Sequence, residues 1–251
     1  MRRFVDTPTA QMVLGVVNTV ANGRVNALIT GPAGMGKTEA LKEAARRDKR
    51  AAMITATPAE KSLRAVLSLV LEVFDLSAFQ DSDTALMAAA LRHELPNRAA
   101  RGRFLIFDEA QILPADVLRQ LLTYSDAPDP LPVVFAGNEH ALKKTRANTA
   151  AFPQIMSRVS IRREIVTMAD GDVDEFCINW NVEGLPAYKL MKAFGSGRTC
   201  REIDQLLAVA RGHAGPAGPI GADVIIHAVV SLHGRDLAKK ISHVLKPELV
   251  K

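Results

Sequence analysis

A glycine-rich segment near the start of the chain has the residue types and the spacing that bind phosphate groups. Residues 31–38, GPAGMGKT, fit the pattern GxxxxGK(S/T) between an apolar run and a run of strong helix formers. Glycines let the backbone curl so that its amides face phosphate oxygens, and the positive end of the following helix strengthens the attraction. We expect Lys37 to neutralise phosphate charge and Thr38 to offer a hydroxyl to Mg²⁺. The residues expected to bind the nucleotide are Gly31, Gly34, Met35, Gly36, Lys37, Thr38 and Glu39.

Two acidic residues follow a second apolar run, Phe104-Leu-Ile-Phe, and their position suits hydrolysis. Side chains at the carboxyl end of a parallel strand project into the crevice where ligands bind. Asp108 is therefore expected to reach Mg²⁺, directly or through water, and Glu109 to orient and polarise an attacking water. ATP is favoured over GTP because no guanine-reading NKxD pattern follows. The pattern predicts an ATPase with ATP and Mg²⁺ as its ligands.

The elements that must position these residues are predicted from the apolar patterns. Strands are expected over residues 26–30, 51–56, 104–107, 133–136 and 160–166. Because parallel strands need helical crossovers, their alternation with helical patterns indicates a parallel sheet covered on both faces. The expected fold class is α/β, a five-stranded parallel P-loop sheet flanked by helices and followed by a small all-α domain.

Helix boundaries are predicted from capping residues and prolines. Thr57-Pro58-Ala59-Glu60 has the pattern of a capping box and predicts a helix that begins there. Another helix is expected from about Asp83 to a residue before Pro96, since proline disrupts helix interiors. Further helices are expected over residues 8–23, 39–47, 114–124, 172–182, 185–194, 199–211 and 222–232. The expected domains are an N-terminal helix packed on the core at 1–25, a nucleotide-binding domain at 26–168 and a helical domain at 169–251.

Composition limits the remaining possibilities. The 251 residues are 48% hydrophobic and 24% charged, which suits one large or two smaller folded domains. Cys177 and Cys200 are too few for a disulfide framework or a four-cysteine zinc site, and the histidines lack metal-binding spacing. No apolar run is long enough to span a membrane, and Asp6 interrupts any signal-like start, so a reducing interior is expected. A net charge of +5 favours polyanionic partners.

Three segments together resemble the AAA+ ATPases: GPAGMGKT, FLIFDEAQ and VVFAGNEH. The resemblance implies that Asn138 senses the γ-phosphate, although a turn-forming role after Gly137 is the alternative. It also implies that Arg158, in Ile-Met-Ser-Arg-Val, enters the site of a neighbouring subunit in trans, which requires an oligomer; an ordinary surface arginine is the alternative. The helical tail resembles the AAA+ lid, whose nucleotide-contacting arginine is Arg198 or Arg201, with Arg198 slightly preferred.

Within that superfamily, the DEAQ segment, the leucine-rich helix after it and the short AGNEH segment resemble the transposition ATPases MuB, TnsC and TniB. This resemblance implies assembly with ATP on double-stranded DNA as a ring or helical filament, a transposase as partner, and release by hydrolysis. It implies a bacterial or phage-infected bacterial cytoplasm. Because MuB has a further N-terminal DNA-binding region and only residues 1–25 precede the first strand here, we expect the ATPase domain itself to bind target DNA.

Basic clusters are the candidate DNA contacts, because DNA phosphates attract exposed lysine and arginine. The preferred set is Lys143, Lys144 and Arg146; the second is Arg98, Arg101 and Arg103; the third is Arg46, Arg47, Lys49 and Arg50. A solvated helix end is the alternative for each. Only 5% of residues are aromatic, so duplex binding without sequence specificity is expected rather than single-strand stacking.

Two other functions remain open from the residues. One is a helicase loader or replication initiator, which would carry an additional segment to contact the helicase or read the origin. The other is a protein-directed regulatory ATPase that does not bind DNA. DNA affinity that depends on nucleotide and falls steeply with salt would favour the transposition regulator over the last of these.

Overall fold

The computed structural model describes residues 4–125, 129–138, 156–216 and 218–245. The chain divides into two compact units. The first, called here the sheet unit, comprises Met12–Pro32 and Lys37–Ile165, and the second, the helical unit, comprises Met1–Gln11, Ala33–Gly36 and Val166–Lys251.

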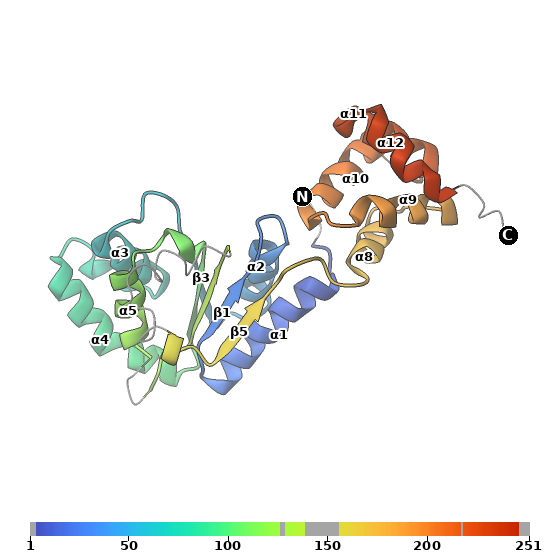
Figure 1. Cartoon of the computed structure of the whole chain (residues 1–251). Coiled ribbons are helices and arrows are strands. Elements are labelled where there is room, and N and C mark those ends of the chain that lie inside the picture. The colour runs from blue at the N-terminus through green and yellow to red at the C-terminus, as the bar shows by residue number, and fades with distance from the viewer. Residues whose placement is uncertain (1–3, 126–128, 139–155, 217, 246–251) are drawn as a thin grey trace. The chain divides into compact units, whose positions relative to one another are not determined.

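The sheet unit is built on five parallel strands (Figure 1). They are β1 (Ala27–Thr30), β2 (Ala51–Thr55), β3 (Phe104–Asp108), β4 (Val133–Gly137) and β5 (Ile161–Glu164). Their order across the sheet is β2-β3-β4-β1-β5, and all four neighbouring pairs are parallel. Every strand expected from the sequence is present, and the predicted fold class is confirmed. In this order the carboxyl ends of β1, β3 and β4 lie side by side, which is where the phosphate loop and the two acids begin.

Helices cover both faces of this sheet (Figure 1). On one face lie α1 (Pro8–Gly23) and α2 (Lys37–Arg47), and on the other lie α3 (Leu63–Val73), α4 (Thr84–Ala100) and α5 (Ala115–Thr123). Alternate strand residues, such as Leu105, Phe107 and Phe135, are buried in one apolar cluster with α3, α4 and α5. Because both faces of the sheet are covered, the interior strands β3 and β4 are buried along their whole length and are nearly all apolar.

Two helix predictions are wrong. The helix expected at Thr57 begins instead at Leu63, with Ser62 as its N-cap accepting a hydrogen bond from the Ala65 amide at 3.2 Å. Glu60 does reach back, accepting from the Thr57 amide at 2.5 Å, but it closes a turn rather than a helix. Only the Glu60 half of the capping box forms, because the Thr57 hydroxyl accepts from the Ala59 amide at 3.3 Å, and Ser62 caps the helix directly before the apolar residue Leu63.

Pro96 lies inside α4 rather than after its end. Leu95 and Ala99 lie one helical turn apart and are both buried, at 1% exposure each, so packing on each side of the proline outweighs the backbone hydrogen bond that it removes.

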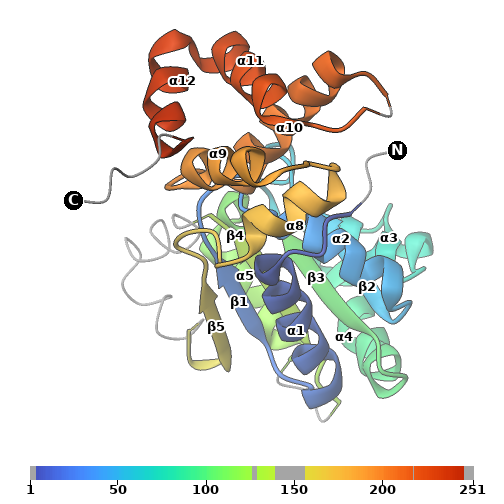
Figure 2. The ribbon, with the colours of Figure 1, turned by 90° about the vertical axis from the view of Figure 1, so that its right-hand side faces the viewer.

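The helical unit has its own apolar core. Its helices are α8 (Asp172–Asn179), α9 (Leu185–Gly195), α10 (Cys200–Ala214), α11 (Ala222–His233) and α12 (Arg235–Ser242), and Figure 2 shows α9 to α12 gathered in one bundle. The first four were predicted. α12 was missed, although Ala238 and Ile241 are buried against the same core. Three single-turn helices complete the described chain: η1 (Ser77–Phe79), η2 (Ala110–Ile112) and η3 (His243–Leu245).

A buried carboxylate ties the start of the chain into the helical unit. Asp172 is fully buried and accepts hydrogen bonds from the Thr9 amide at 2.9 Å, the Thr9 hydroxyl at 2.5 Å and the Ala169 amide at 2.8 Å. These donors satisfy a charge whose burial would otherwise be costly. No sequence pattern predicted this contact, because its partners lie far apart in the chain.

None of the helices in the described ranges is both long and apolar enough to cross a membrane.

Candidate nucleotide site

The phosphate loop leaves β1 through a position that only glycine fits. A Cβ atom on Gly31 would lie 2.5 Å from the carbonyl oxygen of Ile165 and 2.9 Å from its Cβ. The chain leaving β5 therefore crosses directly over the loop entrance. Further along, Gly34 and Gly36 have φ angles of 86° and 84°, in the left-handed region that glycine adopts without strain. The predicted glycine positions thus have a direct conformational reason.

Lys37 lies at the first turn of α2 with its ammonium group turned onto its own loop. Its Nζ atom donates to the carbonyl oxygens of Gly31 and Pro32, both at 2.8 Å, and the residue is 8% exposed. A buried cation held at a helix N-terminus is suited to phosphate oxygens, which compete well with neutral carbonyls.

Thr38 and Asp108 meet at the carboxyl edge of the sheet. The Thr38 hydroxyl donates to Asp108 Oδ2 at 2.7 Å, and Asp108 is 1% exposed. A hydroxyl and a carboxylate oxygen are hard ligands of the kind that Mg²⁺ prefers. The two residues that the sequence predicted as metal ligands are therefore adjacent and fit that ion. No cluster of three or more histidine, cysteine or acidic side chains arranged for metal binding occurs in the described residues.

Glu109 adopts a backbone conformation that is unusual for its type. Its φ and ψ angles are 59° and 34°, in the left-handed helical region, and its amide donates to Asp108 Oδ1 at 2.9 Å. Strained residues of this kind concentrate at functional sites, because the surrounding structure must hold them in place. The turn directs the Glu109 carboxylate toward Gln111, whose Nε2 donates to Glu109 Oε2.

Asn138 follows β4, the neighbour of β3 in the sheet. Its amide donates to Gln111 Oε1 at 3.1 Å. The structure therefore brings Glu109 and Asn138 together through a residue that sequence reasoning did not single out. The signal was present in the DEAQ segment, where a polar side chain stands two positions after the glutamate.

Within the helical unit, residues 33–36 lie against the start of α10. The Arg201 amide donates to the Gly34 carbonyl at 2.9 Å, and a Cβ on Gly34 would lie 3.2 Å from Arg201 Cβ. The guanidinium of Arg201 is exposed and forms no hydrogen bond or ion pair with any residue in the described ranges. Arg201 therefore presents a cation beside the tip of the phosphate loop.

Arg198 is engaged within its own unit. Its Nη1 donates to Glu202 Oε1 at 2.7 Å, and its guanidinium carbon lies 4.4 Å from the centre of the Phe194 ring. Glu202 also completes a capping box with Thr199 at the start of α10. These contacts account for Arg198 structurally, whereas Arg201 has no such role.

The remaining predicted site residues occupy varied positions. Met35 is buried at 2% exposure, and exposed Glu39 pairs with Lys42 at 3.0 Å. Arg158 is half-buried shortly before β5, and its carbonyl accepts a hydrogen bond from Asn26 Nδ2 at 3.0 Å. Lys143, Lys144 and Arg146 lie outside the described residues.

The other two basic clusters lie side by side at the amino-terminal edge of the sheet. Because Ala51 pairs with Phe104, the residues that precede β2 and β3 are neighbours, and the Phe104 amide donates to the Arg50 carbonyl at 3.2 Å. This edge lies at the opposite end of the strands from the phosphate loop.

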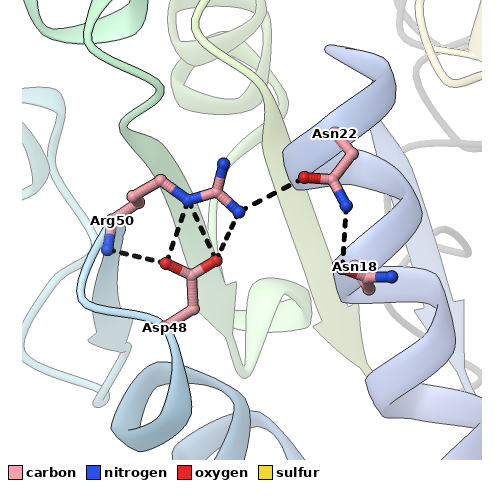
Figure 3. Close-up of polar contacts among 4 residues, drawn as sticks. All are labelled: Asn18, Asn22, Asp48 and Arg50. Atoms are coloured by element: carbon pink, nitrogen blue, oxygen red, sulfur yellow. Dashed lines mark hydrogen bonds and ion pairs between the residues drawn. The ribbon is translucent and has the colours of Figure 1, made fainter.

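Several of these basic side chains are held by local partners. Arg46 and Arg47 both donate to Glu43 at 2.7 Å, and these hydrogen bonds, Arg46 first, hold the pKa of Glu43 down to about 2. Figure 3 shows Arg50 bonded to Asp48 and, across to α1, to Asn22, which in turn donates to Asn18.

Arg103 also has local partners, whereas three nearby basic side chains have none among the described residues. Arg103 donates to the Val73 carbonyl at 3.2 Å and lies over the Phe74 ring. The side chains of Lys49, Arg98 and Arg101 form no hydrogen bond or ion pair with residues of the described ranges.

The chain is similar in sequence to known proteins. A family model described as "AAA domain" matches residues 21–145. The ATP-dependent target DNA activator B of Escherichia phage Mu is 28% identical over 194 residues, which cover 76% of this chain and 60% of that protein. The Mu-like prophage FluMu DNA transposition protein B of Haemophilus influenzae is 24% identical over 217 residues, covering 83% and 73%. The chain thus spans about 60% of the length of the phage relative.

Solved structures give the same fold. Cdc6p from Pyrobaculum aerophilum matches with a TM-score of 0.68 at 13% identity, over 92% of this chain and 70% of that chain. At such low identity the match concerns the fold alone. The family match over residues 21–145, the sequence relatives and the sheet topology agree, and together they support a MuB-like AAA+ ATPase.

Proposed function

We propose that this protein is an ATP-driven regulator of DNA transposition, which assembles on double-stranded DNA without sequence specificity and acts on a transposase. The observation that carries the proposal is the 2.7 Å contact between Thr38 and Asp108, beside Lys37 and Glu109, in a chain similar to target DNA activators over 76% of its length. The site supplies an ATP-dependent step, and the names of the relatives supply the process that the step serves.

The hydrolytic roles follow from where each side chain lies. Lys37 would bind phosphate oxygens from the first turn of α2, and Thr38 with Asp108 would hold Mg²⁺, whose charge would offset that of the transferring phosphoryl group. Glu109 orients the attacking water and accepts its proton at a carboxylate oxygen. Asn138, at the end of the adjacent strand, senses the terminal phosphate.

We assign the lid contact to Arg201 rather than to Arg198. The assignment is supported by the bond between the Arg201 amide and the Gly34 carbonyl, which fixes the start of α10 against the loop tip, and by the engagement of Arg198 with Glu202. An arginine that is free of local partners is available to a phosphate at little energetic cost.

Arg158 is proposed to complete the site of a neighbouring subunit. A mixture of Arg158→Ala and Glu109→Gln subunits tests this, because some mixed interfaces would contain one intact site. ATP hydrolysis by the mixture above the sum of the two variants alone is expected. No gain at any mixing ratio would contradict action in trans.

The DNA surface is proposed to include the amino-terminal edge of the sheet, where Lys49, Arg98 and Arg101 are available to phosphates, together with Lys143, Lys144 and Arg146. The double variant Arg98→Ala/Arg101→Ala should reduce the slope of affinity against salt by about two, because each phosphate contact releases about one counterion. Lys239→Ala/Lys240→Ala, on α12, removes the same charge elsewhere and is the matched control. Equal losses in both variants would refute this assignment.

Nucleotide dependence is the central test of the function. Duplex binding is measured by fluorescence anisotropy with ATP, with ADP and without nucleotide, at several salt concentrations. We expect tight binding with ATP and an affinity at least about tenfold lower in the other two states, since coupling of 1–3 kcal/mol is typical of ligand switches. Equal affinity in the three states would contradict a nucleotide-controlled assembly.

A further inference from the structure

Gln111 makes contacts at both ends of its side-chain amide. Its Nε2 donates to Glu109 Oε2, and its Oε1 accepts from the Asn138 backbone amide at 3.1 Å. The first partner follows β3 and the second follows β4, so one side chain joins the ends of two neighbouring strands. Gln111 itself lies in η2, directly after the left-handed turn at Glu109.

The two partners dictate which way the amide points. A backbone N–H can only donate, so it must face the carbonyl oxygen of Gln111, and a carboxylate can only accept, so it must face the NH₂ group. The opposite orientation would set donor against donor at Asn138 and acceptor against acceptor at Glu109. No other uncharged side chain of this length offers a donor and an acceptor in this arrangement.

We propose that Gln111 is a positioning residue for ATP hydrolysis. It holds the carboxylate of Glu109 at a fixed position relative to Asn138 at the end of β4. The inference rests on the proposed function, because it assigns Glu109 as the residue that activates water. Gln111 occupies one carboxylate oxygen and leaves the other, Oε1, to accept the water proton. It also links Glu109 to Asn138, so that a displacement of Asn138 by the terminal phosphate is passed to the carboxylate.

The left-handed turn at Glu109 explains why its side chain needs the hydrogen bond from Gln111. A non-glycine residue in the left-handed region is held there only by its surroundings. The bond from its own amide to Asp108 fixes the backbone, but the side chain beyond it depends on Gln111. Misplacement of a reacting group by an ångström lowers a rate by about 100-fold, so the orientation of this carboxylate bears directly on turnover.

Two substitutions distinguish the hydrogen bond from Gln111 to Glu109 from the one that Gln111 accepts from Asn138. Gln111→Ala removes both bonds. Gln111→Glu keeps the length and the oxygen that accepts from Asn138, but it replaces the donor to Glu109 with a second carboxylate. Gln120→Ala is the matched control, because Gln120 on α5 is also half-buried and bonds locally, to Tyr124 Oη at 3.2 Å, away from the site.

Steady-state hydrolysis and nucleotide binding are measured for each full-length variant. For Gln111→Ala and Gln111→Glu we expect kcat to fall by about 10- to 100-fold while the Kd for ATP changes by less than about threefold, since only orientation at the reacting end is lost. Gln120→Ala should match the wild type in both. In the Glu109→Gln background, Gln111→Ala should cause almost no further loss, because its effect passes through the glutamate.

Hydrogen exchange of the Asn138 amide gives a readout that does not depend on turnover. In nucleotide-free protein this amide should exchange faster in Gln111→Ala than in the wild type and should stay protected in Gln111→Glu. A merely structural role for Gln111 would change the melting temperature without separating kcat from Kd.

The possible failures are distinguishable. If the wild type hydrolyses ATP and Gln111→Ala retains the same kcat, or if the two losses at positions 109 and 111 are independent, the inference is overturned alone. If the wild type does not hydrolyse ATP at all, the proposed function is overturned and this role with it.

Discussion

In the proposed mechanism Lys37 and Glu109 act on the same ligand at different stages, binding and hydrolysis. The Lys37 ammonium group lies among carbonyl oxygens of the loop at residues 31–38, where we propose that it binds the nucleotide phosphates. Glu109 directly follows β3 and is proposed to act on water rather than on phosphate. Loss of Lys37 should then weaken binding, and loss of Glu109 should slow the chemical step.

Substitutions at Lys37 and Glu109 should therefore affect different properties, ATP binding and ATP hydrolysis. Lys37→Ala is expected to weaken ATP binding by at least about tenfold, whereas Glu109→Gln should bind ATP normally and hydrolyse it about 100-fold or more slowly, as general-base removal does elsewhere. Isothermal titration calorimetry and phosphate release measure the two effects. Similar ATP affinities in both variants would refute the assignment of Lys37.

Substitution of Arg201 and of Arg198 should affect different properties, ATP affinity and thermal stability respectively. Arg201→Ala is expected to lower ATP affinity by about tenfold with an unchanged melting temperature, because its guanidinium has a charge-assisted contact to lose only when phosphate is bound. Arg198→Ala should leave ATP affinity unchanged and lower the melting temperature by about 2–4 °C, through loss of Glu202 and Phe194 contacts worth about 1 kcal/mol. The reverse pattern would favour Arg198 as the nucleotide contact.

At the scale of elements, α2 is stabilised at the end opposite to Lys37 and Thr38. Glu43 is buried at 8% exposure and bonded by Arg46 and Arg47 one turn later. The pKa of its carboxyl is lowered from its ordinary value of 4.5 to about 2, first by the hydrogen bond from Arg46. A carboxyl with a depressed pKa stabilises the fold above its ordinary value and loses that contribution as the pH falls through the folded value.

Glu43→Gln should therefore lower the melting temperature near neutral pH, and the difference from the wild type should shrink between about pH 4.5 and about pH 2. Thermal unfolding followed by circular dichroism across that range measures it. Glu39→Gln is the control, since Glu39 pairs with Lys42 at an exposed position where ion pairs contribute little. A difference that stays constant with pH would mean that packing, not charge, explains the effect.

Sequence patterns predicted the elements well where apolar periodicity was strong and poorly where a local signal stood alone. The interior strands β3 and β4 are nearly continuous apolar runs buried on both faces of the sheet, whereas β5, with the sequence Ile-Arg-Arg-Glu, is a mostly exposed edge strand. Pro96 was misjudged because the packing of Leu95 and Ala99 decides the course of α4 there. A helix start at Thr57 was misjudged because Ser62 is a competing N-cap that lies directly before the apolar residues of α3.

Some residues of the candidate site could be predicted from the sequence and others could not. Lys37, Thr38 and Asp108 could be predicted because each sits at a fixed offset from a strand or helix end. The bridge through Gln111 and the choice of Arg201 could not, since they depend on which strand and helix ends become neighbours.

At the scale of the whole molecule, each unit of the described chain has its own buried apolar residues. Both cysteines belong to the core of the helical unit, and burial raises the pKa of Cys177 and of Cys200 to about 12. Because the thiolate is the reactive form, both thiols are unreactive while this unit stays folded.

Thiol labelling should consequently report the opening of the helical unit. At about pH 8, Ellman's reagent is expected to modify neither cysteine of the folded protein on the timescale on which it modifies both in concentrated guanidinium chloride. Absorbance of the released thiolate measures the rate. Fast reaction of one thiol in the folded protein would contradict its burial.

The left-handed backbone at Glu109 has a consequence for directed evolution. Glycine would relax this turn and is the substitution that a screen for heat tolerance alone should favour there. Such a screen would discard the carboxylate that we propose to activate water, so selection for thermal stability and selection for ATP hydrolysis should favour different residues at position 109.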